Sequence, residues 1–194
     1  MKTNQRGKLI LAVVALIAVA AMVAFTGRAK DKDNDDAIRL SAGLTGFQEV
    51  APKNTTAHGS FHATISEDRS TITWTLTWEG LSGPPLFAHI HIGQKGVNGA
   101  VVVFFCGPAG PTNTKNPCPQ LTSDTISGSF TAADIRQTDA NQPNQPPAGQ
   151  GFTDNHLSDV IRYILAGDGY ANVHTVKYPG GEIRGQIRVR GGDD

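Results

Sequence analysis

A strict alternation of polar and apolar residues between positions 71 and 78 constrains the fold more than any other feature of the chain. Four threonines take turns with four large apolar residues, which are Ile72, Trp74, Leu76 and Trp78. Successive side chains of a β-strand point to opposite faces, so this period of two places the apolar groups against a core and the threonines on the other face. The segment is therefore predicted to be a half-buried strand that needs partners.

Other segments carry the same kind of signal, and turn residues separate them. The chain has 22 glycines and 11 prolines, which favour short strands joined by turns. Residues 38–50 open the domain, and further strands are expected at 59–65, 88–93, 101–105, 126–130, 170–175 and 182–190, the last with Ile183, Ile187 and Val189 facing the core. One short helix is expected over 157–165, where apolar residues recur at helical spacing. We predict an all-β domain, a Greek-key β-sandwich or barrel of about seven or eight antiparallel strands.

The N-terminal segment differs from the rest of the chain. Lys2, Arg6 and Lys8 precede an apolar run from Leu9 to Phe25, the layout of an export signal. We expect an apolar helix within 1–28, a flexible charged linker at 29–37, the β domain at 38–190 and a tail at 191–194. A cleaved signal peptide and a retained membrane anchor through residues 9–25 both stay open, and both predict a secreted, periplasmic or membrane-anchored protein outside the cytoplasm.

Charge and motifs exclude several classes of function. The formal net charge is zero, but five of the 17 basic residues lie before residue 31, so the remainder of the chain is mildly acidic, with 12 basic against 17 acidic residues, which argues against nucleic-acid binding. The sequence contains no Gly-x-Ser-x-Gly or His-Glu-x-x-His motif and no phosphate-binding or dinucleotide-binding loop. A hydrolase or nucleotide-dependent enzyme is therefore disfavoured.

Two long polar segments are expected to be loops. Cys106 and Cys118 are the only cysteines, and in an exported protein a pair at this spacing favours a disulfide that staples the loop between them. Residues 137–151 are rich in Asn, Gln, Pro and Gly and are longer than an ordinary connection. Loops of this length often cover a functional site.

The histidines suggest a metal site. His89 and His91 alternate with apolar residues in one strand, so both imidazoles leave by the same face, about 6–7 Å apart at their origins. His174 and His62 have the same parity in their own strands, opposite the apolar residues. Imidazoles suit copper or zinc, and copper is favoured over zinc for an exported protein.

The completeness of this site stays open in the sequence. His156 and His58 compete with His62 for a fourth ligand position. Each histidine alone is also compatible with a solvated or hydrogen-bonded side chain that binds no metal. Arg184 points outward in the last strand, where it either adds positive potential beside the site or is a solvated charge on an edge strand.

Two blocks of sequence resemble the CHRD domain, the module named from chordin. The first runs from Ala88 to Val102, and the second comprises residues 170–175 and 178–186 with the motif Tyr-Pro-x-Gly-Glu-Ile-Arg-Gly-Gln. The resemblance covers about 38–190 and implies an extracytoplasmic β-sandwich. Members of this family occur in exported prokaryotic proteins and in chordin, an extracellular antagonist of bone morphogenetic proteins.

A weaker similarity connects the chain with the copper/zinc superoxide dismutases. These are also Greek-key barrels with a His-x-His strand, a later histidine, a disulfide and an arginine that attracts superoxide. This similarity implies that His89, His91 and His174 bind copper and that Arg184 is the catalytic arginine, while no segment matches the zinc-binding loop. Two hypotheses follow: a copper-dependent superoxide dismutase acting on small oxygen species, or a non-enzymatic module that binds a protein or matrix partner and has structural histidines.

Overall fold

The computed structural model describes residues 37–107, 116–135, 150–152 and 155–190. The apolar run 9–25, the tail 191–194 and most of the predicted linker and of the loop 137–151 lie outside the described residues. None of the helices in the described part of the chain has the length and apolar character needed to cross a membrane.

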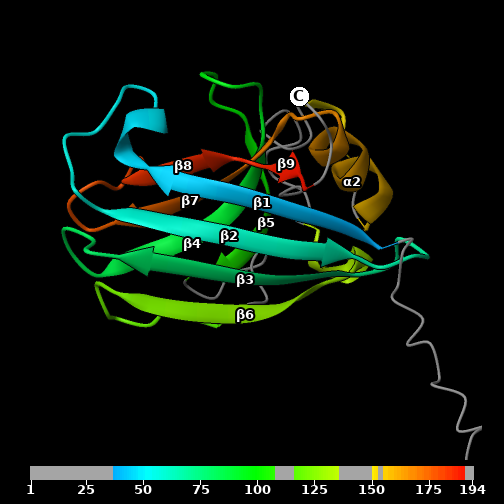
Figure 1. Cartoon of the computed structure of the whole chain (residues 1–194), viewed down its shortest axis with the longest axis horizontal. Helices are drawn as coiled ribbons and strands as arrows, with labels where there is room; N and C mark the ends of the chain where they lie inside the picture. The colour runs from blue at the N-terminus through cyan, green and yellow to red at the C-terminus, as the bar shows by residue number, and fades with distance from the viewer. Residues whose placement is uncertain (1–36, 108–115, 136–149, 153–154, 191–194) are drawn as a thin grey trace, which may run out of the picture. The chain divides into compact units, whose positions relative to one another are not determined.

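Nine antiparallel strands form one sheet that curls into an almost closed barrel (Figure 1). The strands are β1 (Ile38–Thr45), β2 (His58–Ile65), β3 (Ile72–Glu79), β4 (Pro85–Ile92), β5 (Ala100–Cys106), β6 (Asp124–Phe130), β7 (Gly169–Thr175), β8 (Ile183–Gln186) and β9 (Arg188–Val189). Their order is β5-β4-β7-β8-β1-β2-β3-β6, and β9 pairs with β1. The prediction of an all-β antiparallel fold is confirmed.

The strand expected from Glu182 to Arg190 is divided in two. Ile187, which is fully buried, separates β8 from β9, and its N–H donates to the carbonyl of Gly169 at the start of β7, the strand beside β8. The break does not change which side the residues face, because Val189 lies opposite the buried Leu40 of β1. Val189 is nevertheless 38% exposed, so it lies on the core side of its strand but is not part of the buried core.

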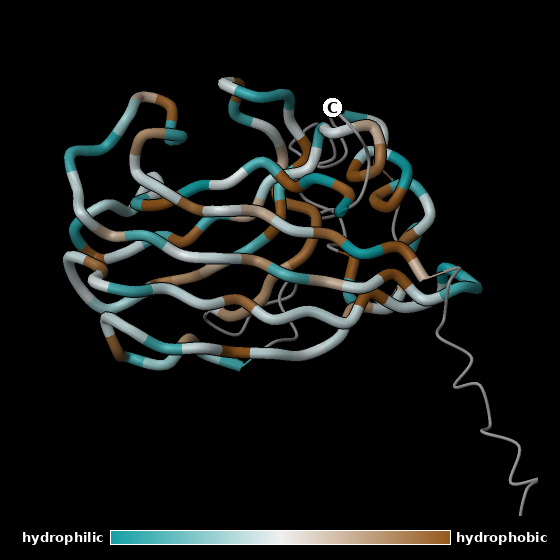
Figure 2. The backbone as a smooth tube through the Cα atoms, viewed as in Figure 1, coloured by the Kyte–Doolittle hydropathy of each residue, from teal (hydrophilic) through white to brown (hydrophobic). Residues whose placement is uncertain are grey.

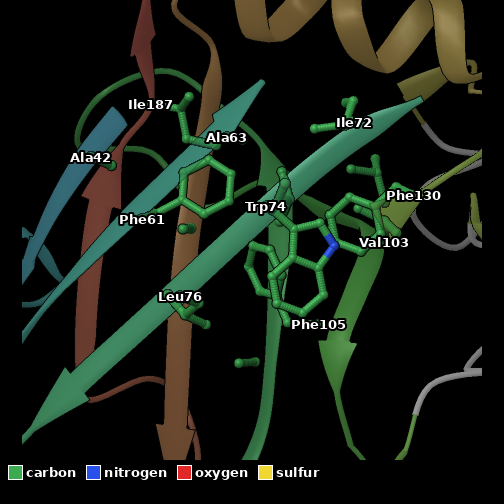
Figure 3. Close-up of a cluster of buried hydrophobic side chains, with 14 of the residues drawn as sticks. Ala42, Phe61, Ala63, Ile72, Trp74, Leu76, Val103, Phe105, Phe130 and Ile187 are labelled. Atoms are coloured by element: carbon green, nitrogen blue, oxygen red, sulfur yellow. The ribbon is translucent and has the colours of Figure 1, made fainter. Parts of the chain in front are cut away.

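The core fills the inside of the barrel and matches the alternation in the sequence. All four apolar residues of β3 are at most 4% exposed. Trp74 lies at the centre of an aromatic cluster, with ring centroids 4.8 Å from Phe105 and 5.2 Å from Phe130 (Figure 3). Because β3 and its neighbours all place one face inside, the opposite side chains form the outer surface of the barrel.

Helix α2 (Leu157–Leu165) has the bounds that the sequence predicts. Val160, Ile161 and Ile164 are buried, and the tube in Figure 2 alternates between hydrophobic and hydrophilic colours along this helix. The one-sided pattern explains why the helix packs against the sheet although the fold is otherwise β. Short 3-10 helices cover Gly46–Gln48 and Ala132–Asp134.

The predicted disulfide between Cys106 and Cys118 is present, with the two Cα atoms 4.8 Å apart. It joins the end of β5 to the segment that leads into β6. These two strands are the edges of the sheet, and no hydrogen-bonded ladder connects them within the described residues. The disulfide therefore ties the barrel together on the side where strand pairing does not close it.

Candidate metal site

Strands β4 and β7 place three histidines on the outer face of the barrel. In β4, Ala88, Ile90 and Ile92 are at most 1% exposed and lie in the core, so the intervening His89 and His91 point outward. Strand β7 follows the same rule, with its apolar residues inside and His174 outside. The two strands pair antiparallel, which brings the histidines of both strands into one group.

The three imidazoles lie close enough to share one ion after a small adjustment. One ligand nitrogen from each of His89, His91 and His174 lies within 4.8 Å of the others. The ring centroid of His89 is 4.4 Å from that of His91 and 4.6 Å from that of His174. Ligands at about 2.0–2.1 Å from a tetrahedral ion are about 3.3–3.5 Å apart, so nitrogens that now lie up to 4.8 Å apart would have to approach by at most about 1.5 Å.

Backbone carbonyls set the orientation of two of these rings. The Nδ1 of His91 lies 2.8 Å from the carbonyl oxygen of Gly99, and the Nδ1 of His174 lies 2.9 Å from that of Pro179. A carbonyl can only accept, so each Nδ1 carries the proton and each Nε2 keeps its lone pair in the neutral ring. Such partners fix the tautomer and orientation of metal-binding histidines.

His174 has the protonation state that a metal ligand needs. Its Nε2 is buried and has no hydrogen-bond partner among the described residues. Burial lowers the pKa of His174 to about 4, and the bond to the Pro179 carbonyl only partly opposes this effect. The ring is therefore neutral at pH 7, with a lone pair directed into a region that contains two more imidazoles.

Aromatic rings cover the three histidines. His89, His91 and His174 are 3%, 9% and 6% exposed. The ring of Phe87 lies 4.6 Å from His174, and the ring of Tyr170 stacks on His91 at 4.6 Å with an angle of 9° between the planes. The sequence correctly predicts that the histidines face away from the core. This outer face is nevertheless buried, because aromatic rings cover it.

The phenol of Tyr170 and the peptide of Gly99 form a bridge behind His91. The N–H of Gly99 donates to the hydroxyl oxygen of Tyr170 at 3.1 Å, while the carbonyl of Gly99 accepts from His91. A Cβ at Gly99 would collide with the carbonyl of Ile92, so only glycine fits at this position. One peptide group therefore positions both rings of the stacked pair.

Arg184 is buried rather than solvated. It is 1% exposed, and its guanidinium lies 3.4 Å from the centroid of the Tyr170 ring. It donates to the carbonyls of Gln94 and Val97 and to the side-chain oxygen of Asn98. Strand β8 lies between β7 and β1, so the interpretation of Arg184 as a solvated charge on an edge strand is wrong. The guanidinium fastens the turn after β4 to the outer face.

Glu49 is a buried carboxyl near this group that the sequence pattern does not indicate. It is 5% exposed, and it accepts a hydrogen bond of 2.6 Å from the side chain of Asn172, which lies opposite His89 in the β4–β7 pair. Burial raises the pKa of Glu49 to about 7, although Asn172 and the charge of Arg184 oppose the shift. Glu49 lies after the first 3-10 helix, where no periodicity could single it out.

A second buried carboxylate, Glu182, fixes the loop that orients His174. Its oxygens accept from the hydroxyls of Thr55, Ser82 and Thr175 and from the N–H of Ser82. Burial alone would raise the pKa of Glu182, but these hydrogen bonds outweigh it and lower the pKa below the usual value. The carboxylate thus holds residues 176–181, including the carbonyl that accepts from His174, against two distant loops.

The other histidines lie elsewhere. His62 is exposed on the outer face of β2, opposite Ser41 of β1 and Thr75 of β3. His58 lies 3.5 Å from the carboxylate of Glu79, and His156 lies 3.5 Å from that of Asp159. Within the described residues, the side chains grouped so that they could hold a metal ion are therefore His89, His91 and His174, and the structure does not bring His62 to them.

Comparison with known proteins gives one result. The sequence model of the CHRD domain matches residues 40–187, which is more than half of the chain. No curated protein and no solved structure matches the chain. The comparisons therefore bear out the resemblance to this domain and give no support to the similarity with superoxide dismutases.

Proposed function

The chain belongs to the CHRD domain family, and from its histidine site we propose that it is an extracytoplasmic copper-binding protein. The family and the Cys106–Cys118 disulfide agree on a location outside the cytoplasm. The proposal depends on one observation: nitrogens of His89, His91 and His174 converge within 4.8 Å. These three side chains would be the ligands.

Copper fits this donor set better than other common metals. A site of neutral imidazoles without a carboxylate disfavours magnesium, calcium and manganese, which prefer oxygen ligands. Between copper and zinc, the general order of stability for divalent ions favours copper. Imidazole also binds both Cu(II) and Cu(I), and the aromatic cover of Phe87 and Tyr170 limits access of water to the ion.

Copper titration of the purified full chain tests the proposal. We expect one Cu(II) per chain with a spectrum typical of imidazole nitrogen ligands. The H89A/H91A variant should weaken binding by at least about a hundredfold, since two of three ligands are lost. The matched control H62A/H156A removes two exposed histidines and should bind as the unmodified chain does. Equal copper binding by H89A/H91A would contradict the proposal.

Superoxide dismutation is a second candidate function. Three protein ligands leave a coordination position for a small molecule, the arrangement of catalytic metal sites. Copper bound there would supply a Cu(II)/Cu(I) couple that oxidises one superoxide to dioxygen and reduces a second, with two protons, to hydrogen peroxide.

The copper-loaded chain separates the enzyme from the binding module. Rapid superoxide removal that is lost in H89A/H91A would support the enzyme. Stoichiometric copper without superoxide removal would instead support the non-enzymatic module, and it would leave the copper site itself intact.

A further inference from the structure

A hydroxyl-rich surface covers the side of the barrel formed by β1, β2 and β3. The core-facing residues of these strands are buried, and the alternate positions carry Ser, Thr and His side chains that are exposed or partly exposed. Figure 1 shows these three strands with β6 as one layer of the barrel and β4, β7 and β8 behind it. We call this surface the threonine face.

A groove crosses the threonine face near the start of β1. It encloses about 210 Å³. Its polar side chains, which define the arginine groove, are Arg39, His62, Thr64, Thr73, Thr75 and Arg190. Two permanent positive charges and one histidine therefore lie beside three hydroxyl groups.

The sheet itself brings the two arginines together. Arg39 of β1 lies opposite Thr64 of β2, and the backbone N–H of Arg190 donates to the carbonyl of Arg39 at 2.8 Å. Both side chains are exposed, and neither has an ion-pair partner among the described residues. Neighbouring like charges repel each other, so a fold gains nothing in stability from this pairing.

The rest of the domain makes this charge pattern distinctive. Residues 38–190 carry 11 acidic and 11 basic residues, so this domain has no net positive charge, yet two arginines without an ion-pair partner among the described residues share one groove. A guanidinium presents a planar fork of N–H donors that matches a carboxylate or sulfate group. The adjacent threonine hydroxyls can donate to or accept from the hydroxyl groups of a sugar.

We propose that the arginine groove binds an anionic polysaccharide. Arg39 and Arg190 bind its carboxylate or sulfate groups, and Thr64, Thr73 and Thr75 contact its hydroxyls. Its lining offers no exposed large apolar side chain, which membrane insertion requires. It also has no exposed aromatic ring on which a nucleic-acid base could stack, because Trp74 is 4% exposed.

Retention of the full chain on immobilised heparin and on immobilised polygalacturonate tests the proposal, with neutral dextran as the reference matrix. We expect binding to at least one of the two anionic polymers, weakening with salt because bound counterions are released. The R39Q/R190Q variant should bind about tenfold more weakly or worse, since two charge-assisted contacts are lost. The control R162Q/K177Q removes two charges from other parts of the surface and should bind normally.

Three outcomes would overturn the proposal. They are equal retention of R39Q/R190Q, equal retention on dextran, and binding to phosphatidylglycerol vesicles that neither soluble polymer displaces, which would assign the groove to a membrane surface. Thermal unfolding of R39Q/R190Q checks that a loss of binding is not a loss of fold. The H89A/H91A variant should bind the polymers normally, so this test is independent of the copper site.

Discussion

Two outer faces of this barrel are built from strands with the same alternation, yet one is covered and the other is open. On β4 and β7 the outward side chains include His89, His91 and His174, which are at most 9% exposed. On β1, β2 and β3 they include Arg39, His62 and the threonines, which are exposed or partly exposed. The strands of both faces have the same alternation, and the faces differ in whether other side chains and loops cover them.

The cover of the first face consists of groups that hold one another in place. Arg184 fastens the turn after β4, and Glu182 fastens the loop after β7 through residues that lie up to 127 positions away in the chain. Over the arginine groove no such layer is present among the described residues. A buried outer face therefore depends on polar side chains that hold loops over it. Substitutions should consequently act very differently on the two faces.

The largest expected difference concerns two arginines. R184M removes a buried guanidinium and leaves the carbonyl of Val97 without this donor, while the carbonyl of Gln94 keeps the N–H of Val97, so the free energy of unfolding should fall by about 3–5 kcal/mol. R39M on the open face should change it by no more than about 0.5 kcal/mol. Urea unfolding of both variants measures this pair. Equal losses of unfolding free energy in the two variants would show that the groups covering the first face do not make the two faces differ in stability.

Glu49 should give the covered face a dependence on pH. Its pKa is raised to about 7 from an ordinary value of 4.5, so the folded state holds a proton that the unfolded chain releases. Its contribution to stability is present below pH 4.5 and is lost as the pH rises through about 7, by roughly 3 kcal/mol. E49Q should lack this loss, with E79Q as the matched control. The free energy of unfolding, measured at pH 4.5 and pH 8, tests this expectation. An equal fall of this free energy in E49Q would contradict the prediction.

Copper should stabilise the protein through the covered face alone. At a free copper concentration about a hundred times the Kd, a native-state ligand adds about 2.7 kcal/mol to the free energy of unfolding. The resulting rise in Tm should be unchanged in H62A and absent in H174A. Calorimetry with and without copper measures the rise for each variant, so any intrinsic destabilisation cancels. A normal rise in H174A would remove that residue from the ligand set.

The smallest expected difference concerns single hydroxyl groups. Y170F removes the acceptor for the N–H of Gly99, which should cost about 1–2 kcal/mol and weaken copper binding about tenfold, because the same peptide orients His91. T77V on the open side breaks the exposed 2.9 Å hydrogen bond to Thr125 and should cost no more than about 0.5 kcal/mol. Unfolding and copper titration of both variants test this pair. Unchanged copper affinity in Y170F would show that the hydrogen bond from Gly99 to Tyr170 does not support the copper site.

The sequence predicts this fold well where the physics is local. The alternation of β3, the bounds of α2 and the disulfide follow from spacing, because side-chain direction in a strand or helix depends on neighbours in the chain. Parity also places His89, His91 and His174 on one side of their strands. It cannot separate them from His62, because that distinction depends on strand order.

The parts that sequence could not predict depend on distant contacts. The burial of Arg184 requires the turn after β4 to lie over β8, and the role of Glu49 requires Asn172 to lie across from it. The division of the last strand at Ile187 accompanies a hydrogen bond from its N–H to the carbonyl of Gly169 in β7, more than 15 residues earlier in the chain. None of these contacts produces a periodic pattern in the amino-acid sequence.

The disulfide between Cys106 and Cys118 has a consequence for the life of the protein before it is exported. It joins the two sides of a sheet whose edges, β5 and β6, share no ladder in the described part of the chain. In a reducing compartment the disulfide would not form, and two strand edges would offer free backbone donors and acceptors to other chains. Oxidation therefore holds the two edges of the sheet close to each other, and we expect it to reduce edge-to-edge aggregation.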